Sequence, residues 1–294
     1  MTVLVTGGTG FVGPKVVHAL RAQERPVRVL ARKPDKQERL RAWGCEIVQG
    51  DMTDAAELRR AVAGCDAVVH LVAILLGSPQ AFERVMVQGT RDLVGAAKEA
   101  GVRRFVLMSA LGTSERTKDA SPYYHAKWEE ERAVEGSGLD HTIFRPSFVF
   151  GRDGGILGNL VRIVRWSPVT PVVGTRQLQP IWVDDVASYI ARALEVGNKG
   201  DGTWELGGPD RVTWEELNER LRRVMGKRRL AFRVPTGLLK AGATVGELLP
   251  PLRGARAGVE MLEAEDNVTD IGPAVEAFGV HPISLDEQLR RAVA

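Results

Sequence analysis

A glycine-rich turn near the start of the chain constrains the fold more than any other feature. A short β-branched and apolar run over residues 2–5 is followed by three glycines, Gly7, Gly10 and Gly13, and apolar residues then recur at helical spacing over 16–20. The pattern predicts a strand, a turn and a helix. A helix N-terminus has unpaired backbone N–H groups and a partial positive charge, so a phosphate can bind there if no side chain blocks it. Glycines leave that approach open, and their position between a strand and a helix favours a dinucleotide site over an ordinary turn.

The pattern as far as residue 108 alternates strands with helices. Strands are predicted at 27–31, 46–48, 67–72 and 104–108, and helices at 55–63 and 89–100. Such alternation indicates parallel strands joined by right-handed helical crossovers, and therefore an α/β fold with a doubly wound parallel sheet of the Rossmann type. Ligands of these sheets bind beyond the carboxyl ends of the strands.

The pattern loosens after residue 150, which predicts a smaller C-terminal substrate lobe. We expect a Rossmann domain over residues 1–150, completed by about 178–207, and a lobe over 151–177 and 208–294. Helices are predicted over 156–166 and from Asp184, and a further strand near 203–206. The stretch Thr213–Glu216 matches a capping box that begins another helix. The apolar stretch 238–252 is predicted to be lobe core.

Composition limits the classes of function. Apolar residues make up 44% of the chain and charged residues 26%, which is ordinary for a folded globular protein. The formal net charge of +3 is too small to indicate a nucleic-acid partner. Cys45, Cys65 and the histidines have no ligand spacing, so we predict no metal site and a reducing compartment. The first strand begins at Thr2, and the apolar stretch 67–76 is too short to span a membrane, so we expect a cytoplasmic protein.

Two cations after the second predicted strand bear on the choice of dinucleotide. This position holds Arg32 and Lys33, with no acid before Asp35. An acid there would bond the ribose 2′-hydroxyl of NAD, whereas arginine accommodates the 2′-phosphate of NADP. The sequence therefore favours NADP(H), with NAD(H) as the alternative, although both side chains could simply be solvated. Asp51, after the third strand, could bond the adenine amino group or cap the following helix.

A second informative stretch is SPYYHAK at residues 121–127. Ser121 suits a helix N-cap and Pro122 the first helical position, so Tyr123 and Lys127 lie four residues apart on one face. We expect the helix dipole and the ammonium to favour the phenolate and to lower the pKa of Tyr123 from about 10 toward neutrality. Tyr123 could then act as a general acid or base. The alternative is a packed aromatic ring beside a solvated charge.

Several stretches together carry a resemblance to a known family. They are Thr6–Gly13, Gly50–Met52, Gln88–Thr90, Tyr123–Lys127, Arg145–Pro146 and Trp182–Val186. With these residues the chain resembles the short-chain dehydrogenase/reductase superfamily, in its extended or atypical branch. Within that branch it is most similar to proteins like the nucleotide-binding accessory subunit of respiratory complex I, a group that Leu206–Pro209, Val234–Pro235 and the tail Met261–Leu289 also fit. The likeness covers nearly the whole chain.

The resemblance implies roles for individual residues. Lys127 would hold the nicotinamide ribose, Tyr123 would exchange a proton with a carbonyl or hydroxyl substrate, and Ser109 would polarise the substrate oxygen. The cofactor would contact Gly7, Thr9, Gly10, Phe11, Val12, Gly13, Arg32, Lys33, Asp51, Met52, Val72, Ala73, Lys127 and Pro146.

The chain departs from the family pattern at two points. Met86 stands where the family usually has an active-site asparagine. Many relatives also carry the polarising hydroxyl slightly later than Ser109, where this chain has Ala110 and Leu111 before Thr113 and Ser114. The catalytic set implied by the resemblance is therefore incomplete at one position and ambiguous at another.

The leading hypothesis is an NADP(H)-binding oxidoreductase that passes hydride between nicotinamide and a carbonyl carbon of an unknown small molecule. One alternative is a non-catalytic dinucleotide-binding protein that acts in redox sensing or in the stability or assembly of a complex, with a membrane complex as one partner. Another is a sugar-type epimerase or dehydratase. Seven Lys and Arg residues over 220–233 could attract a membrane surface or an acidic partner, but a solvated helix face is the simpler interpretation because glutamates precede them. The oligomeric state is not constrained.

Overall fold

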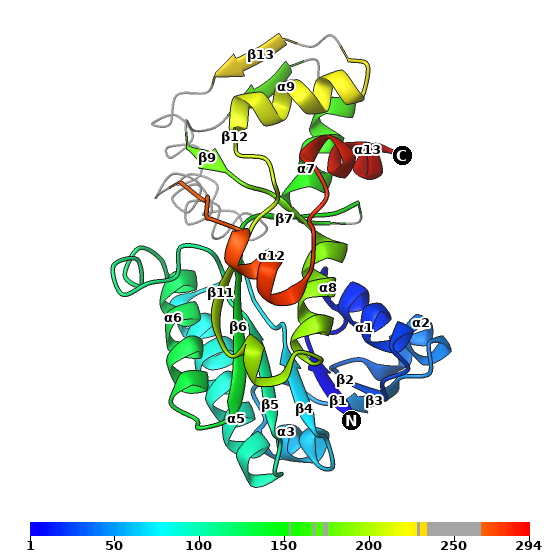
Figure 1. The fold of residues 1–294 in the computed structure, drawn as a ribbon, viewed down its shortest axis with the longest axis vertical. Helices are drawn as coiled ribbons and strands as arrows, with labels where there is room; N and C mark the ends of the chain where they lie inside the picture. The colour runs from blue at the N-terminus through cyan, green and yellow to red at the C-terminus, as the bar shows by residue number, and fades with distance from the viewer. Residues whose placement is uncertain (153, 167–168, 173–175, 228–229, 234–265) are drawn as a thin grey trace.

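The computed structural model describes residues 1–152, 154–166, 169–172, 176–227, 230–233 and 266–294 (Figure 1). The stretch 238–252, predicted as lobe core, lies outside the described residues. None of the helices described combines the length and the apolar character needed to cross a bilayer.

A seven-stranded sheet forms the centre of the fold. Its order is β11-β6-β5-β4-β1-β2-β3, and every neighbouring pair is parallel. The strands are β1 (Val3–Thr6), β2 (Val27–Ala31), β3 (Glu46–Gln49), β4 (Ala67–His70), β5 (Arg104–Met108), β6 (Asp140–Pro146) and β11 (Gly202–Leu206). This arrangement confirms the predicted doubly wound sheet. The strand order reverses between β1 and β4, and ligands bind in the crevice at such a switch point.

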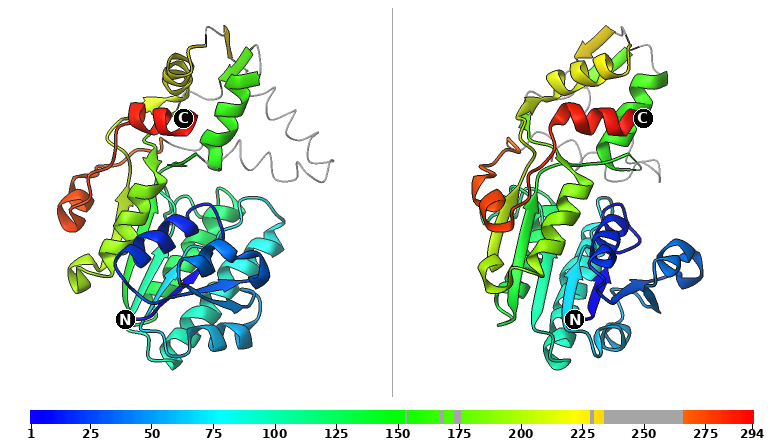
Figure 2. Two further views of the ribbon diagram at one scale, coloured as in Figure 1. Left: turned by 90° about the vertical axis from the view of Figure 1, so that its right-hand side faces the viewer. Right: turned by 45° about the vertical axis from the view of Figure 1, so that its right-hand side comes forward.

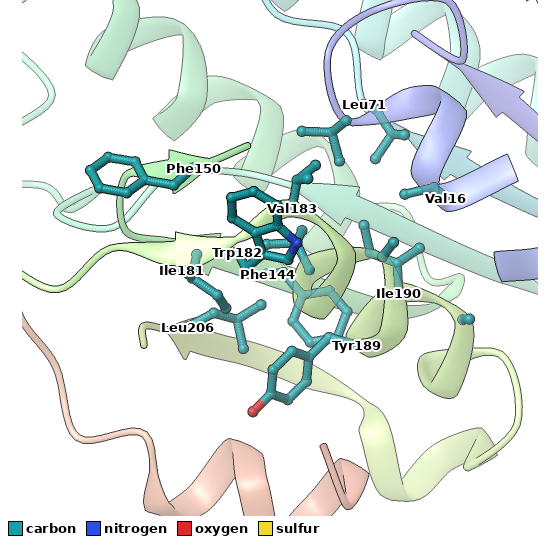
Figure 3. Packing of buried hydrophobic residues seen from close by; sticks show 14 of the residues in the cluster. Val16, Leu71, Phe144, Phe150, Ile181, Trp182, Val183, Tyr189, Ile190 and Leu206 are labelled. Carbon is teal, nitrogen blue, oxygen red and sulfur yellow. The ribbon is translucent and has the colours of Figure 1, made fainter. Parts of the chain in front are cut away.

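Helices cover both faces of the sheet because its central strands are buried on both sides. The helices α1 (Gly13–Ala22) and α8 (Val183–Ala193) pack together on one face. The other face carries α3 (Ala55–Val62), α5 (Gly89–Glu99) and α6 (Pro122–Glu135). Alternate residues of β1 follow this division: Val3 and Val5 lie in the core beneath α1, and Leu4 lies in the core beneath α3. Figure 3 shows the first core where Phe144 of β6 meets Tyr189 and Ile190 of α8.

A second group of helices and small sheets lies beyond the carboxyl ends of the strands of the main sheet, as Figure 2 shows. Its helices in the described residues are α7 (Gly155–Trp166), α9 (Trp214–Val224) and α13 (Leu285–Val293). Among the same residues, three two-stranded sheets accompany them: β13 (Leu230–Arg233) with β8 (Val169–Val172), β12 (Val212–Thr213) with β9 (Gln177–Leu178), and β10 (Ile181–Trp182) with β7 (Val149–Phe150). The predicted capping box is confirmed, because the Thr213 hydroxyl accepts from the Glu216 N–H and the Glu216 carboxylate accepts from the Thr213 N–H.

One helix of the predicted lobe segment lies on the main sheet instead. The helix α12 (Gly272–Phe278) contacts β11 and α8, and the Phe278 ring packs edge-on against Phe144, Tyr189 and Trp204. The aromatic ring finds its apolar partners on the sheet, so residues 272–278 return to the Rossmann core. The domain boundaries stay a prediction.

The fourth strand is shorter than predicted. The sequence predicts a strand over 67–72, whereas β4 ends at His70, and Leu75 and Leu76 beyond it are 65% and 53% exposed. The reason lies in the two neighbouring strands. Because β1 ends at Thr6 and β5 ends at Met108, β4 has no strand to pair with beyond Leu71, whose N–H donates to the Thr6 carbonyl.

Short helices complete the described structure. They are η1 (Pro34–Lys36), α2 (Glu38–Ala42), α4 (Pro79–Phe82), the π-helix η2 (Glu83–Gln88) and η3 (Gly197–Gly200). The π-helix leads directly into α5 and packs on α6. Such turns are rare and occur often at functional sites.

Candidate active site

The glycine turn joins β1 to α1 at very close range. Gly7 has φ +73°, a conformation that favours glycine. A Cβ added at Gly13 would lie 2.3 Å from the Gly7 carbonyl oxygen and 2.5 Å from the Gly8 carbonyl carbon. A Cβ at Gly10 would meet only the Gly7 oxygen, at 3.3 Å, so this side of the turn is open. The N-terminus of α1 has no side-chain cap and no acid in its first turn, which fits an anionic diphosphate.

The turn lies against the segment that follows β4. A Cβ at Gly7 would come within 2.8 Å of the Leu71 carbonyl carbon and 2.9 Å of the Val72 nitrogen. The sequence-predicted Val72 and Ala73 therefore begin the segment beside the turn, at the switch point. Phe11 extends from the turn to the start of α7, where Gly151 and Gly154 leave room for its ring: a Cβ at either would lie 2.8 Å from it. Thr9 is exposed, and Val12 is buried under the turn.

The two cations expected to select the dinucleotide follow β2 as predicted. Arg32 and Lys33 are exposed, and within the described part of the chain neither forms an ion pair with a carboxylate. Asp51 lies within the electrostatic reach of Arg32. Although partial burial opposes it, two hydrogen bonds from Thr53 and the charges of Arg32 and Arg84 lower the pKa of Asp51.

Asp51 does not cap the following helix, so that alternative is wrong. Its Oδ1 accepts from the Thr53 N–H at 2.9 Å and from the Thr53 hydroxyl at 2.8 Å, which closes a local turn. The N-cap of α3 is Asp54, which accepts from the N–H groups of Ala56 and Glu57. Asp54 caps because it directly precedes the helix, whereas Asp51 lies a turn earlier. The contact of Asp51 with adenine stays a prediction. Met52, the next residue, is buried against Gly89.

The helix α6 begins as predicted and carries the Tyr–Lys pair. The Ser121 hydroxyl accepts from the Tyr124 N–H at 3.2 Å, and Pro122 follows the cap. Tyr123 is in the first turn, and the Lys127 Nζ lies 6.0 Å from the centroid of its ring. Lys127 is only 1% exposed, and its ammonium donates to the Met108 carbonyl at the end of β5, at 2.9 Å. The sequence-predicted pair therefore lies at the carboxyl edge of the sheet.

The expected low pKa of Tyr123 is wrong in this structure. Burial and the negative charge of Glu130 raise the pKa of Tyr123 above its ordinary value of 10. The expectation considered only the helix dipole and Lys127. It omitted the carboxylate of Glu130, which lies 2.9 Å from the Lys127 ammonium and is itself fully buried. The phenol is therefore neutral at pH 7.

A buried polar network missed in the sequence runs from Glu130 to the glycine turn. Thr90 Oγ1 lies 3.2 Å from Glu130 Oε1 and 2.9 Å from His70 Nε2, and His70 Nδ1 lies 2.6 Å from Thr6 Oγ1. All four side chains are 0% exposed. Signals existed for two of them: His70 interrupts an apolar run, and Glu130 is three residues from Lys127 on the same helix.

Two of the three candidate hydroxyls for polarising a substrate lie side by side. Ser109 and Thr113 are both buried, and the Ser109 hydroxyl donates to Thr113 Oγ1 at 3.4 Å. Ser114, the third candidate, instead lies 3.0 Å from the Thr117 hydroxyl. Pro146 ends β6 and is buried. The structure thus places the Thr113 hydroxyl beside Ser109 at the end of β5.

Met86 fills the place of the expected asparagine with an apolar side chain. It is 0% exposed in the π-helix and belongs to a small core with Phe82, Val87 and Ala126, against which Tyr123 packs. Met86 can accept or donate no strong hydrogen bond there. The polar contacts of Lys127 consequently come from Met108 and Glu130.

An open glycine turn and an uncapped helix N-terminus at the switch point of a parallel sheet define a dinucleotide-binding Rossmann protein. The chain belongs to the NAD(P)H-binding family, whose model matches residues 7–196. The predicted kinship with NAD(P)-binding oxidoreductases of the short-chain type is thereby confirmed.

Individual relatives agree with this assignment. The chain is 30% identical to a ceramide reductase of Caulobacter vibrioides over 246 residues, which cover 83% of this chain and 77% of the relative. It is 29% identical to mitochondrial NADH dehydrogenase [ubiquinone] 1 alpha subcomplex subunit 9 of Mus musculus over 306 residues, or 98% and 79% of the two chains. A solved nucleoside-diphosphate-sugar epimerase of Staphylococcus aureus has the same fold, with a TM-score of 0.80, 19% identity and coverage of 99% and 100%.

Proposed function

We propose that the protein is an NADP(H)-dependent reductase that converts a carbonyl group of a small molecule into an alcohol. The observation that carries the proposal is the Lys127 ammonium, buried beside the Tyr123 ring and held at the carboxyl end of β5. A buried charge is costly unless it is paired, and it is a strong electrostatic source where water is excluded. At this edge of the sheet that source can stabilise a negative charge that develops during a reaction.

The chemistry follows from the protonation state of Tyr123. The bound dinucleotide would supply the hydride, which adds two electrons to the carbonyl carbon. The Tyr123 hydroxyl gives its proton to the carbonyl oxygen, and the alcohol leaves a phenolate behind. Lys127 stabilises this phenolate until Tyr123 takes a proton from solvent. The neutral phenol carries the proton that reduction requires, and because its raised pKa makes it a weak acid, the transfer depends on Lys127 stabilising the phenolate that forms.

Ser109 is proposed to donate a hydrogen bond to the same substrate oxygen. Its hydroxyl and that of Thr113 lie together at the end of β5, the strand that also supplies the Met108 carbonyl for Lys127. The substrate oxygen would then receive two donors, which stabilise charge as it develops there. Ser109→Ala is expected to lower kcat while leaving NADPH affinity unchanged.

The preference for NADP(H) rests on Arg32 and Lys33. Both are exposed at the end of β2, where a 2′-phosphate would gain charge-assisted hydrogen bonds. Arg32→Ala is expected to weaken NADPH binding about 10-fold or more, because a hydrogen bond to a charged group contributes about 1.5–3 kcal/mol. NADH binding should not change. Lys36→Ala, an exposed cation in the following turn, is the control. Equal loss of both dinucleotides in Arg32→Ala would contradict the preference.

The test of catalysis compares wild type with Tyr123→Phe on a panel of aldehydes and ketones, followed by NADPH absorbance. The variant is expected to lose about 10²–10⁴-fold in kcat, the range typical of general acid catalysis. Tyr124→Phe is the matched control, because its hydroxyl donates to the Leu111 carbonyl from the adjacent position. A wild-type protein that binds NADPH but reduces nothing in the panel would refute the proposal.

A second candidate function is non-catalytic dinucleotide binding in support of a protein complex. Two observations favour it: Met86 replaces the expected asparagine, and Lys127 is already paired with Glu130. The mouse relative is named as a subunit of NADH dehydrogenase. This function predicts that the protein binds NADPH tightly without turnover. It also predicts that a partner protein copurifies with it. An epimerase or dehydratase would instead retain its dinucleotide through purification and show no net consumption.

A further inference from the structure

We propose that Glu130 is the positioning residue of the Tyr123–Lys127 pair, and that Thr6, His70 and Thr90 orient its carboxylate from the glycine turn. The proposal rests on the proposed reductase function and deepens it. Glu130 touches neither the expected hydride path nor the phenol proton. It acts through Lys127, whose ammonium it holds at 2.9 Å.

The network has one consistent set of hydrogen-bond directions. Thr90 donates its hydroxyl proton to Glu130 Oε1, so it must accept from His70 Nε2. Burial and the nearby Lys127 lower the pKa of His70 to about 3, so the ring is neutral and has a single N–H. His70 Nδ1 then accepts from the Thr6 hydroxyl. Every donor points toward Glu130; burial raises the pKa of its carboxyl group, and the Lys127 ammonium and the hydrogen bonds from Lys127 and Thr90 oppose that rise.

The same carboxylate fixes the ammonium. Of the three N–H groups of Lys127, one donates to Glu130 Oε2 and one to the Met108 carbonyl. These acceptors come from α6 and β5, two elements packed on each other, so the ammonium is held from two directions. One N–H remains that no described residue accepts, and it is the one available to a ribose hydroxyl.

A neighbouring glutamate serves as a control that distinguishes a positioning role of Glu130 from structural support. Glu131 is also 0% exposed, and its two oxygens accept from Arg145 at 2.9 and 2.6 Å. It therefore offers a buried carboxylate on the same helix that pairs with a strand residue instead of Lys127. If Glu130 only stabilises the fold, Glu130→Gln and Glu131→Gln should have the same effects.

The first experiment reads the ionisation of Tyr123 without any substrate. The chain has three tyrosines, and Tyr124 and Tyr189 donate to backbone carbonyls. An ultraviolet titration of tyrosinate, with Tyr123→Phe subtracted, isolates Tyr123. The charged and titratable groups that bear on the pair are Lys127, Glu130 and Glu131 of α6 and His70 of β4. Glu130→Gln is expected to move the Tyr123 transition at least about one pH unit lower, because a negative charge is removed and Lys127 stays. Glu131→Gln should leave it in place.

The second experiment measures reduction. Glu130→Gln should lower kcat by about 10-fold or more with a smaller change in KM, and Glu130→Asp, which keeps the charge, should recover part of the loss. Equal Tyr123 transitions in wild type and Glu130→Gln, or equal effects of the two glutamine variants, would overturn the proposal. If wild type reduces no substrate, the proposed function fails, but the tyrosinate titration still decides the role of Glu130.

A double variant covers the case in which Glu130→Gln does not fold. Each single change, Lys127→Met or Glu130→Gln, leaves one buried partner without its counterpart, whereas the double change removes both. The double variant is expected to lose less stability in urea unfolding than the sum of the two single losses, and to fold even where Glu130→Gln alone does not. A double variant whose loss equals that sum, or that does not fold although Lys127→Met folds, would show that the two residues are not coupled and would overturn the proposal.

Discussion

The close approach of α1 to β1 gives the sharpest prediction. Gly13→Ala places a Cβ 2.3 Å from the Gly7 oxygen, whereas real Cβ atoms do not come within 3.0 Å of such atoms. The obstacle is backbone, so α1 must move away from β1 by about 0.7 Å. That movement loosens the contacts of Val16, Val17 and Leu20, all 0% exposed. Overpacking of this kind costs about 1–3 kcal/mol, which corresponds to a fall in Tm of about 2–5 °C.

Gly10→Ala is the matched control and should separate folding from binding. Its Cβ meets one atom at 3.3 Å, so Tm without dinucleotide should change little. The same Cβ occupies the open side of the turn where the diphosphate is expected. In wild type, NADPH at about 100 times its Kd should add about 2.7 kcal/mol of stability, and Gly10→Ala should lose most of that gain.

Differential scanning calorimetry with and without NADPH measures both effects. Gly13→Ala should have a lowered Tm in either condition. A Gly13→Ala variant as stable as wild type, or a Gly10→Ala variant destabilised as strongly as Gly13→Ala, would refute the close-contact reasoning. An unchanged NADPH-dependent rise in Tm for Gly10→Ala would place the diphosphate elsewhere.

Three further predictions test other parts of the chain. Burial, with a smaller contribution from Asp184, raises the pKa of Asp185 from 3.8 to about 6, so the folded state loses stability as pH rises from about 4 through 6. Asp185→Asn should therefore raise Tm at pH 7.5 and lose this gain near pH 4, and a pH-independent difference would contradict it. Gly95→Ala, in the middle of α5 with no atom within 4 Å of the added Cβ, should stabilise the protein by about 0.5–1 kcal/mol in urea unfolding. Thr213→Ala should cost about 1 kcal/mol by removing the cap of α9, and Thr213→Ser should restore it.

The sequence predicted elements whose signals are local. The bounds of β2 and β5 match the prediction, and the capping box of α9 and the Ser121 cap of α6 lie where the residue types placed them. These features depend on backbone groups a few residues apart. The end of β4 depends instead on where the neighbouring strands β1 and β5 end, and the place of α12 depends on apolar rings elsewhere in the fold. Neither is encoded by the local sequence.

Ion pairs offset part of the positive charge of the basic stretch after residue 219. Within the described part of that stretch, Arg220 pairs with Asp210 and Asp286, and Arg223 pairs with Glu219. The two acids that pair with Arg220 lie outside its own helix. Their positions reduce the positive field that a membrane surface or an acidic partner would encounter, which agrees with a solvated helix face.

The candidate site also has one part that the local sequence predicts and another that depends on other elements of the fold. The spacing of Tyr123 and Lys127 is a property of one helix, so the sequence predicted their common face. The run of three glutamates that follows could not show which carboxylate turns inward, because that depends on Thr90 and His70 from two other elements. Burial and, to a smaller extent, the charge of Glu130 raise the pKa of Tyr123. A tyrosine that starts protonated beside a fixed ammonium can give a proton and then be stabilised as the anion, whereas one that starts as phenolate must take a proton from an alcohol.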